Sequence, residues 1–105
     1  MSTINKTAIV TGAGRGIGQG IAKALAEAGH KVVVADIDEN EAAKTASELK
    51  TAGFDVLAIK CDVSSKADIE QLFASAVKEF GQVDILVNNA GVYPFRLFAQ
   101  MSETD

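Results

Sequence analysis

The feature that most constrains this chain is a glycine-rich turn between an apolar run and an amphipathic run. The turn reads Thr11-Gly12-Ala13-Gly14-Arg15-Gly16-Ile17-Gly18. The run before it, residues 8–10, is too short and too β-branched for a helix, so it predicts a buried parallel strand. The run after it predicts a helix whose apolar face holds Ile17, Ile21, Ala24, Leu25 and Ala28.

The glycine spacing gives each glycine a role beside a bound phosphate. A helix N-terminus has unpaired N–H groups and a partial positive charge, so this one is expected to attract the pyrophosphate of a dinucleotide. The pattern is Thr-Gly-x-x-x-Gly-x-Gly, not G-x-G-x-x-G, because position 17 is isoleucine. We expect Gly12 to make the turn, Gly16 to admit the pyrophosphate and Gly18 to let helix pack on strand. A merely flexible turn is the alternative, which the flanking elements disfavour.

A second apolar strand, residues 31–35, ends at Asp36, 18 residues after Gly18. An acid at this point accepts hydrogen bonds from the adenosine ribose and repels a 2′-phosphate, so NAD is favoured over NADP. The alternative is that Asp36 or Asp38 only caps the next helix. Arg15 argues for NADP, since a basic residue in the turn could reach a 2′-phosphate; the charge of Asp36 is given more weight.

Composition restricts the partners and the setting. A chain of 105 residues predicts a single domain with a small core. The net charge of −4, without a Lys/Arg cluster, argues against nucleic acid and anionic membranes. Cys61 is the one cysteine, and no His/Cys/carboxylate cluster suggests a metal. Without an apolar leader run or a stretch that could span a bilayer, the cytoplasm is the expected location.

The rest of the chain alternates helix and strand. Helices are predicted over 39–52 and 65–80, strands over 56–59 and 83–87, and Gly53 and Gly81 end the helices. Ser64 or Ser65 caps the second of these helices, with Asp68 in a capping-box-like position. The inward residues are predicted to be Ala42, Ala43, Ala46, Leu49, Ile69, Leu72, Phe73, Ala76, Val77 and Phe80. The order βαβαβαβ predicts an α/β fold, a Rossmann-like parallel sheet with strand order 3-2-1-4.

Two more loops follow strand ends, where ligands bind in open α/β sheets. In Cys61-Asp62-Val63, Asp62 either accepts the adenine amino group or favours the following helix, and spacing alone does not decide. In Asn88-Asn89-Ala90-Gly91, the residue types by themselves favour a tight turn over a ligand contact.

Together these four segments resemble the short-chain dehydrogenase/reductase family over the whole chain. The resemblance implies a cofactor loop at 11–18, an NAD-selecting acid at Asp36, an adenine contact at 62–63, and a fourth-strand motif at 88–91 in which Asn89 lies near the ribose and Asn88 ties the sheet together. The expected cofactor-binding residues are therefore Gly12, Arg15, Gly16, Ile17, Gly18, Asp36, Ile37, Asp62, Val63, Asn89, Ala90 and Gly91.

The chain departs from the family at the catalytic residues. The family pattern Tyr-x-x-x-Lys is missing, because the one tyrosine, Tyr93, is followed four residues later by Leu97. No catalytic residue is therefore expected here, and the ending at 102–105, which is typical of a helix start, predicts a truncated N-terminal half. Two functions remain open: the NAD(P)-binding part of an oxidoreductase for alcohols or carbonyls, such as 3-oxoacyl or sugar and polyol substrates, or a non-catalytic nucleotide-binding or interaction module. The open edge of the strand at 83–87 predicts a homo-oligomer, or else a marginal monomer that is prone to aggregation.

Overall fold

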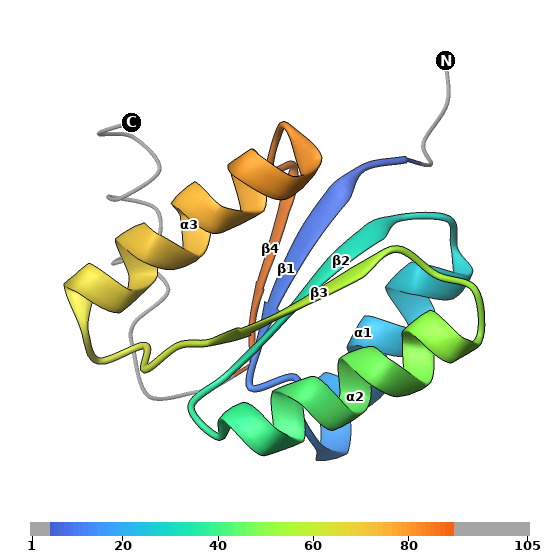
Figure 1. Cartoon of the computed structure of the whole chain (residues 1–105), viewed down its shortest axis with the longest axis horizontal. Coiled ribbons are helices and arrows are strands. Elements are labelled where there is room, and N and C mark those ends of the chain that lie inside the picture. Colours follow the sequence, from blue (N-terminus) through green and yellow to red (C-terminus); the bar gives the residue numbers. More distant parts are fainter. Residues whose placement is uncertain (1–4, 90–105) are drawn as a thin grey trace.

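The computed structural model describes residues 5–89, which form a four-stranded sheet with helices on both faces (Figure 1). The elements are β1 (Thr7–Thr11), α1 (Gly16–Glu27), β2 (Lys31–Asp36), α2 (Glu39–Thr51), β3 (Val56–Lys60), α3 (Lys66–Phe80) and β4 (Ile85–Asn88). All neighbouring strands are parallel, in the order β3-β2-β1-β4. The predicted α/β class, element order and strand order are confirmed.

The two faces of the sheet carry separate cores. Figure 1 shows α1 and α2 on one face and α3 on the other. Along β2, Val32 and Val34 pack toward α1 and α2, while Val33 and Ala35 pack toward α3, as the two-residue period of a strand requires. Since the chain crosses to the other face after β3, β1 and β4 become neighbours, and their carboxyl ends flank the switch point where ligands bind in such folds.

The predicted inward faces of the helices were wrong in part. The buried residues of α1 are Gly18, Ala22 and Ala26, whereas Ile17 is 77% exposed, and Ile21 and Leu25 are half-buried. Ala24, Ala28, Ala43 and Val77 are also exposed. In α1 the predicted face included the larger apolar side chains of Ile17, Ile21 and Leu25. In α1 the smallest residues face the sheet instead, because they let the helix axis approach it most closely.

The helices begin in two different ways. Asp38 caps α2 by accepting hydrogen bonds from the backbone N–H groups of Asn40 and Glu41, at 3.0 and 3.2 Å. Ser65, one of the two predicted candidates, caps α3 through the N–H of Asp68 at 3.1 Å. Arg15 precedes α1 and makes no side-chain cap, and no acid lies in the first turn of α1. Among the three described helices, α1 therefore keeps an uncapped N-terminus.

Across residues 5–89, no helix has both the length and the apolar character to cross a membrane. The same residues contain no group of three or more His, Cys, Asp or Glu side chains that could hold a metal ion.

Candidate functional site

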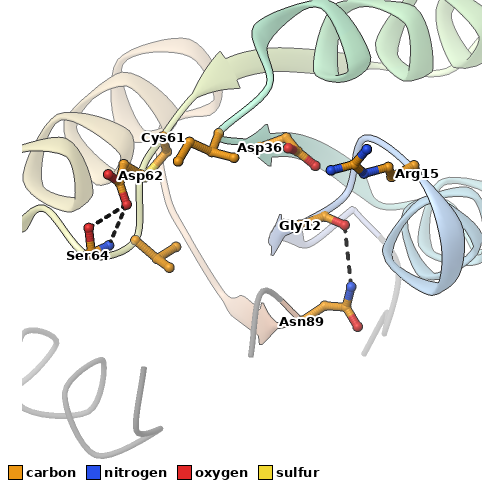
Figure 2. A pocket seen from close by; sticks show the side chains of 9 residues that line it. Gly12, Arg15, Asp36, Cys61, Asp62, Ser64 and Asn89 are labelled. Carbon is orange, nitrogen blue, oxygen red and sulfur yellow. Dashed lines mark hydrogen bonds between the residues drawn. The ribbon is translucent and has the colours of Figure 1, made fainter. Parts of the chain in front are cut away.

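A pocket of about 570 Å³ opens at the carboxyl ends of the strands. Figure 2 shows that its walls come from four loops, one after each strand. The lining residues are Gly12, Arg15, Asp36, Ile37, Cys61, Asp62, Val63, Ser64 and Asn89. The structure thus brings together residues from positions 12 to 89 that the sequence could only place at one edge of the sheet.

The glycine turn has the backbone geometry that its glycines permit. Gly12 and Gly16 have φ angles of 63° and 62°, in the left-handed region that side chains other than glycine rarely adopt. A Cβ atom on Gly16 would have nothing within 4 Å, so the space around this residue is open. The open space beside the first turn of α1 suits the close approach of a ligand to the backbone.

Gly18 is a glycine for a different reason, which is packing. A Cβ atom on Gly18 would lie 2.0 Å from the carbonyl oxygen of Gly12 and 2.6 Å from Nδ2 of Asn89. The prediction that Gly18 permits close packing holds, but the neighbours are the glycine turn and the end of β4 rather than the body of β1. Gly18 therefore joins α1 to both loops of the switch point.

Asp36 lies at the end of β2 with only 5% of its surface exposed. Its Oδ2 accepts a hydrogen bond from the backbone N–H of Gly14, and its Oδ1 accepts one from that of Asp38, both at 2.9 Å. The carboxylate thus holds the glycine turn against β2 and also orders the start of α2. A carboxylate has about four acceptor positions, and the backbone groups of Gly14 and Asp38 fill two of them among residues 5–89.

Arg15 is exposed and lines the pocket beside Asp36. Figure 2 shows its side chain extending toward the carboxylate. Arg15 also precedes the first residue of α1, so its cation adds to the positive end of the helix dipole. The Arg15 cation and the buried acid Asp36 thus lie together in this part of the pocket, which suits a ligand with both phosphates and hydroxyls.

The wall after β3 is built around Asp62. Its Oδ1 accepts hydrogen bonds from the Ser64 hydroxyl at 2.6 Å and the Ser64 N–H at 2.9 Å, which lower the pKa of Asp62. The backbone N–H of Asp62 donates to the carboxylate of Asp68 at 3.0 Å. The spacing of Ser65 and Asp68 suggested a capping box, in which the Asp68 carboxylate would accept the N–H of Ser65. This carboxylate accepts the N–H of Asp62 instead. Asp62 shapes the turn before α3, which was one of the two alternatives left open by the sequence. It also lines the pocket, and its contact with an adenine amino group stays a prediction.

Cys61 also lines the pocket, although only 3% of it is exposed. Burial, followed by the nearby carboxylates of Asp68 and Asp62, raises the pKa of the Cys61 thiol to about 11. The protonated thiol is a poor nucleophile and metal ligand. The interpretation of Cys61 as a small buried hydrophobic residue fits this environment.

The wall after β4 is tied to β1 by hydrogen bonds. The Thr11 hydroxyl lies 3.1 Å from Oδ1 of Asn88, to which it donates, and accepts the N–H of Asn89 at 3.0 Å. Nδ2 of Asn89 donates to the carbonyl oxygen of Gly12 at 3.3 Å, as the dashed line in Figure 2 shows. Asn88 thus joins the two strands, and Asn89 fixes the glycine turn while facing the pocket.

Most of the predicted site residues that lie within 5–89 meet at this pocket. Gly16, Ile17 and Gly18 do not line it, and Ala90 and Gly91 lie outside the described residues, as do Tyr93 and Leu97. Ser64 lines the pocket but was predicted only as a cap. Thr45 was missed altogether: it is buried in α2, and its hydroxyl donates to the carbonyl oxygen of Gly14 at 2.9 Å. No pattern in the sequence separates Thr45 from an ordinary helical threonine.

The model of the family described as short chain dehydrogenase matches residues 6–105. The chain belongs to the short-chain dehydrogenase family. Over 89 residues it is 49% identical to the (S)-acetoin-forming diacetyl reductase of Staphylococcus epidermidis, an alignment that covers 85% of this chain and 35% of the relative. Over 89 residues it is 44% identical to the L-fucose dehydrogenase of Oryctolagus cuniculus, covering 85% of this chain and 30% of that relative.

Solved structures agree with the curated relatives. A hydroxysteroid dehydrogenase from Escherichia coli superposes with a TM-score of 0.81 at 39% identity, covering 95% of this chain and 46% of the other. A short-chain dehydrogenase/reductase from Burkholderia phymatum in complex with NAD superposes with a TM-score of 0.79 at 38% identity, covering 82% and 31%. The chain spans about a third of the length of the curated relatives described above.

Proposed function

We propose that this chain binds NAD in the pocket and forms the nucleotide-binding part of an oxidoreductase acting on an alcohol or a carbonyl group. The observation that carries the proposal is a pocket of about 570 Å³ lined by the glycine turn before α1, the buried acid of β2 and the loops after β3 and β4. Membership of a dehydrogenase family and a structural neighbour in complex with NAD support it.

The pocket offers each part of a dinucleotide a different chemical environment. The N–H groups at the start of α1 and the Arg15 cation suit the pyrophosphate, and the Asp36 carboxylate suits the adenosine ribose. Ile37 and Val63 offer apolar surface to the adenine, with Asp62 beside its amino group. Asn89 lies across the glycine turn, where a second ribose would pass. When bound, NAD supplies a hydride acceptor for oxidation of an alcohol.

The preference for NAD over NADP rests on Asp36. An ionised carboxylate next to a 2′-phosphate carries an electrostatic penalty, and burial of Asp36 increases it because less water screens the charge. Arg15 offsets part of this penalty from its exposed position. We give Asp36 the deciding role, since its carboxylate is buried and fixed by two hydrogen bonds, while the Arg15 side chain is exposed.

The proposal includes cofactor binding without turnover by this chain alone. The 105 residues contain no Tyr-x-x-x-Lys pair to supply the acid–base group of the alcohol–carbonyl step. General acid–base catalysis is worth about 10²–10⁴-fold in rate. The names of the relatives cover diacetyl, L-fucose and hydroxysteroids, so their common chemistry, the interconversion of alcohols and carbonyls, is as far as the substrate is proposed.

Calorimetric titration of NAD into the wild-type chain and two glycine variants tests the binding site. Gly16→Val places a side chain against the proposed pyrophosphate position, and we expect affinity to fall more than about tenfold, beyond 1.4 kcal/mol. Gly53→Val is the matched control, because Gly53 also has a positive φ and nothing within 4 Å, but follows α2 at the opposite end of the sheet. Equal affinities in the two variants would refute the phosphate-binding role of the turn.

A further inference from the structure

The hydroxyl of Thr45 forms its hydrogen bond outside its own helix, with the glycine turn. Thr45 is 1% exposed, and its Oγ1 donates to the carbonyl oxygen of Gly14 at 2.9 Å. A threonine inside a helix commonly donates instead to a carbonyl three or four residues earlier in the same helix. This bond bridges 31 positions of sequence, from the middle of α2 to the loop after β1.

Gly14 is held on its other side as well. Its N–H donates to Oδ2 of Asp36 at 2.9 Å, and the N–H of the preceding Ala13 donates to the carbonyl oxygen of Ala35 at 3.0 Å. A Cβ atom on Gly14 would lie 2.7 Å from Cβ of Glu41, so α2 packs directly against the turn. Both polar backbone groups of Gly14 are therefore bonded within the chain, and Thr45 supplies the donor for one of them.

The direction of the following peptide groups depends on this arrangement. Arg15 and Gly16 come immediately after Gly14 and carry N–H groups at the start of α1, where the proposed function places the pyrophosphate. We propose that Thr45 is a positioning residue for the dinucleotide, one that holds the glycine turn in its binding conformation through Gly14 without touching the ligand. A turn fixed in advance leaves less conformational freedom to lose on binding. This inference rests on the proposed function, since it concerns the same pocket.

The central experiment replaces the hydroxyl and keeps the shape. Thr45→Val is expected to weaken NAD binding in calorimetric titration about tenfold, which corresponds to about 1.4 kcal/mol. Thr45→Ser restores the hydroxyl and is expected to stay within about twofold of the wild-type Kd. If Thr45→Val does not fold, Thr45→Ala, which adds no bulk, replaces it in the comparison.

Thr7→Val is the matched control. Thr7 is also a 1% exposed threonine, but its Oγ1 has no hydrogen-bond partner among residues 5–89, and it lies at the start of β1, away from the pocket. Removing this hydroxyl is expected to leave the Kd for NAD unchanged. A Thr7→Val variant that weakens binding as much as Thr45→Val would show that the effect comes from the core in general and would overturn the inference.

Hydrogen exchange without NAD gives a second readout. The amide of Gly14 is expected to exchange at least about fivefold faster in Thr45→Val than in the wild type, while amides of β3 keep their rates. If the wild type binds NAD and Thr45→Val binds it equally tightly, the role of Thr45 is wrong and the proposed function stands. If the wild type does not bind NAD, the proposed function is wrong and the positioning role falls with it.

Discussion

A methyl group added at Gly18 tests the packing of α1 against the switch point. In Gly18→Ala the new Cβ atom would lie 2.0 Å from the Gly12 carbonyl oxygen, whereas ordinary contacts begin at 3.4 Å. Helix and turn would have to separate by about 1.4 Å, and both partners are backbone rather than flexible side chain. The same movement would disturb the hydrogen bond of 3.3 Å from Asn89 to Gly12.

The expected cost follows from three terms. Overpacking a tight contact costs about 1–3 kcal/mol, and here the upper end applies because backbone must move. Losing the Asn89 hydrogen bond adds about 1 kcal/mol, and the better helix propensity of alanine returns about 1 kcal/mol. The free energy of unfolding should thus fall by about 3 kcal/mol, a large part of the ~5–15 kcal/mol expected for a domain of this size.

Urea denaturation of Gly18→Ala and Gly20→Ala gives the comparison. Gly20 lies in the same helix, but a Cβ atom there would have nothing within 4 Å, so the substitution should stabilise the chain by up to ~1 kcal/mol. With an m-value of about 1 kcal/mol/M, the urea midpoint of Gly18→Ala should fall by about 3 M. A midpoint within about 0.5 M of the wild type, or an equal loss in Gly20→Ala, would refute the reasoning.

Four further predictions concern three side chains and the edge of the sheet. Asp36→Ala should narrow the preference for NAD over NADP and weaken both cofactors, since it also releases Gly14; titration with each cofactor checks this, and an undiminished preference for NAD contradicts it. Cys61, with its pKa near 11, should resist iodoacetamide at pH 8 until the chain is unfolded, as mass spectrometry would show. Because the pKa of Asp62 is lowered in the fold, its contribution to stability should be complete above pH 3.8 and lost as the pH falls through the folded pKa; Asp62→Asn should remove this dependence from urea midpoints. The chain should self-associate through the edge of β4, and light scattering of a stable monomer at high concentration, with slow exchange over residues 85–88, would contradict it.

The hydrophobic periodicity of the sequence and its helix-ending glycines were enough to predict the fold. The strand runs are short, apolar and β-branched, and the helical runs repeat every three to four residues, so each element could be predicted with bounds within about two residues of those observed. The stop signal at Gly81 has a direct cause, because its φ of 87° closes α3. Strand order followed from the rule that parallel crossovers are right-handed, together with one reversal after β3.

Which side of a helix is buried was harder to predict. Alanine is apolar enough for a core and small enough for a surface, so Ala24 and Ala43 could not be told from Ala22 and Ala42 by type. Val77 has the right spacing for the core of α3, yet 47% of it is exposed. The geometry of packing decides these positions, and it depends on how near each helix lies to the sheet.

Within the site, the sequence placed residues at the correct edge but presented their roles as exclusive alternatives. Asp36 was to be either a ribose acceptor or a cap, and Asp62 either an adenine contact or a helix signal. A carboxylate has about four acceptor positions. Asp36 accepts one hydrogen bond from the N–H of Gly14 and one from the N–H of Asp38. One oxygen of Asp62 accepts both the N–H and the hydroxyl of Ser64. The local hydrogen bonds fix the side chain of Asp36, so a substitution meant to change cofactor preference should also loosen the turn that we propose binds the phosphates.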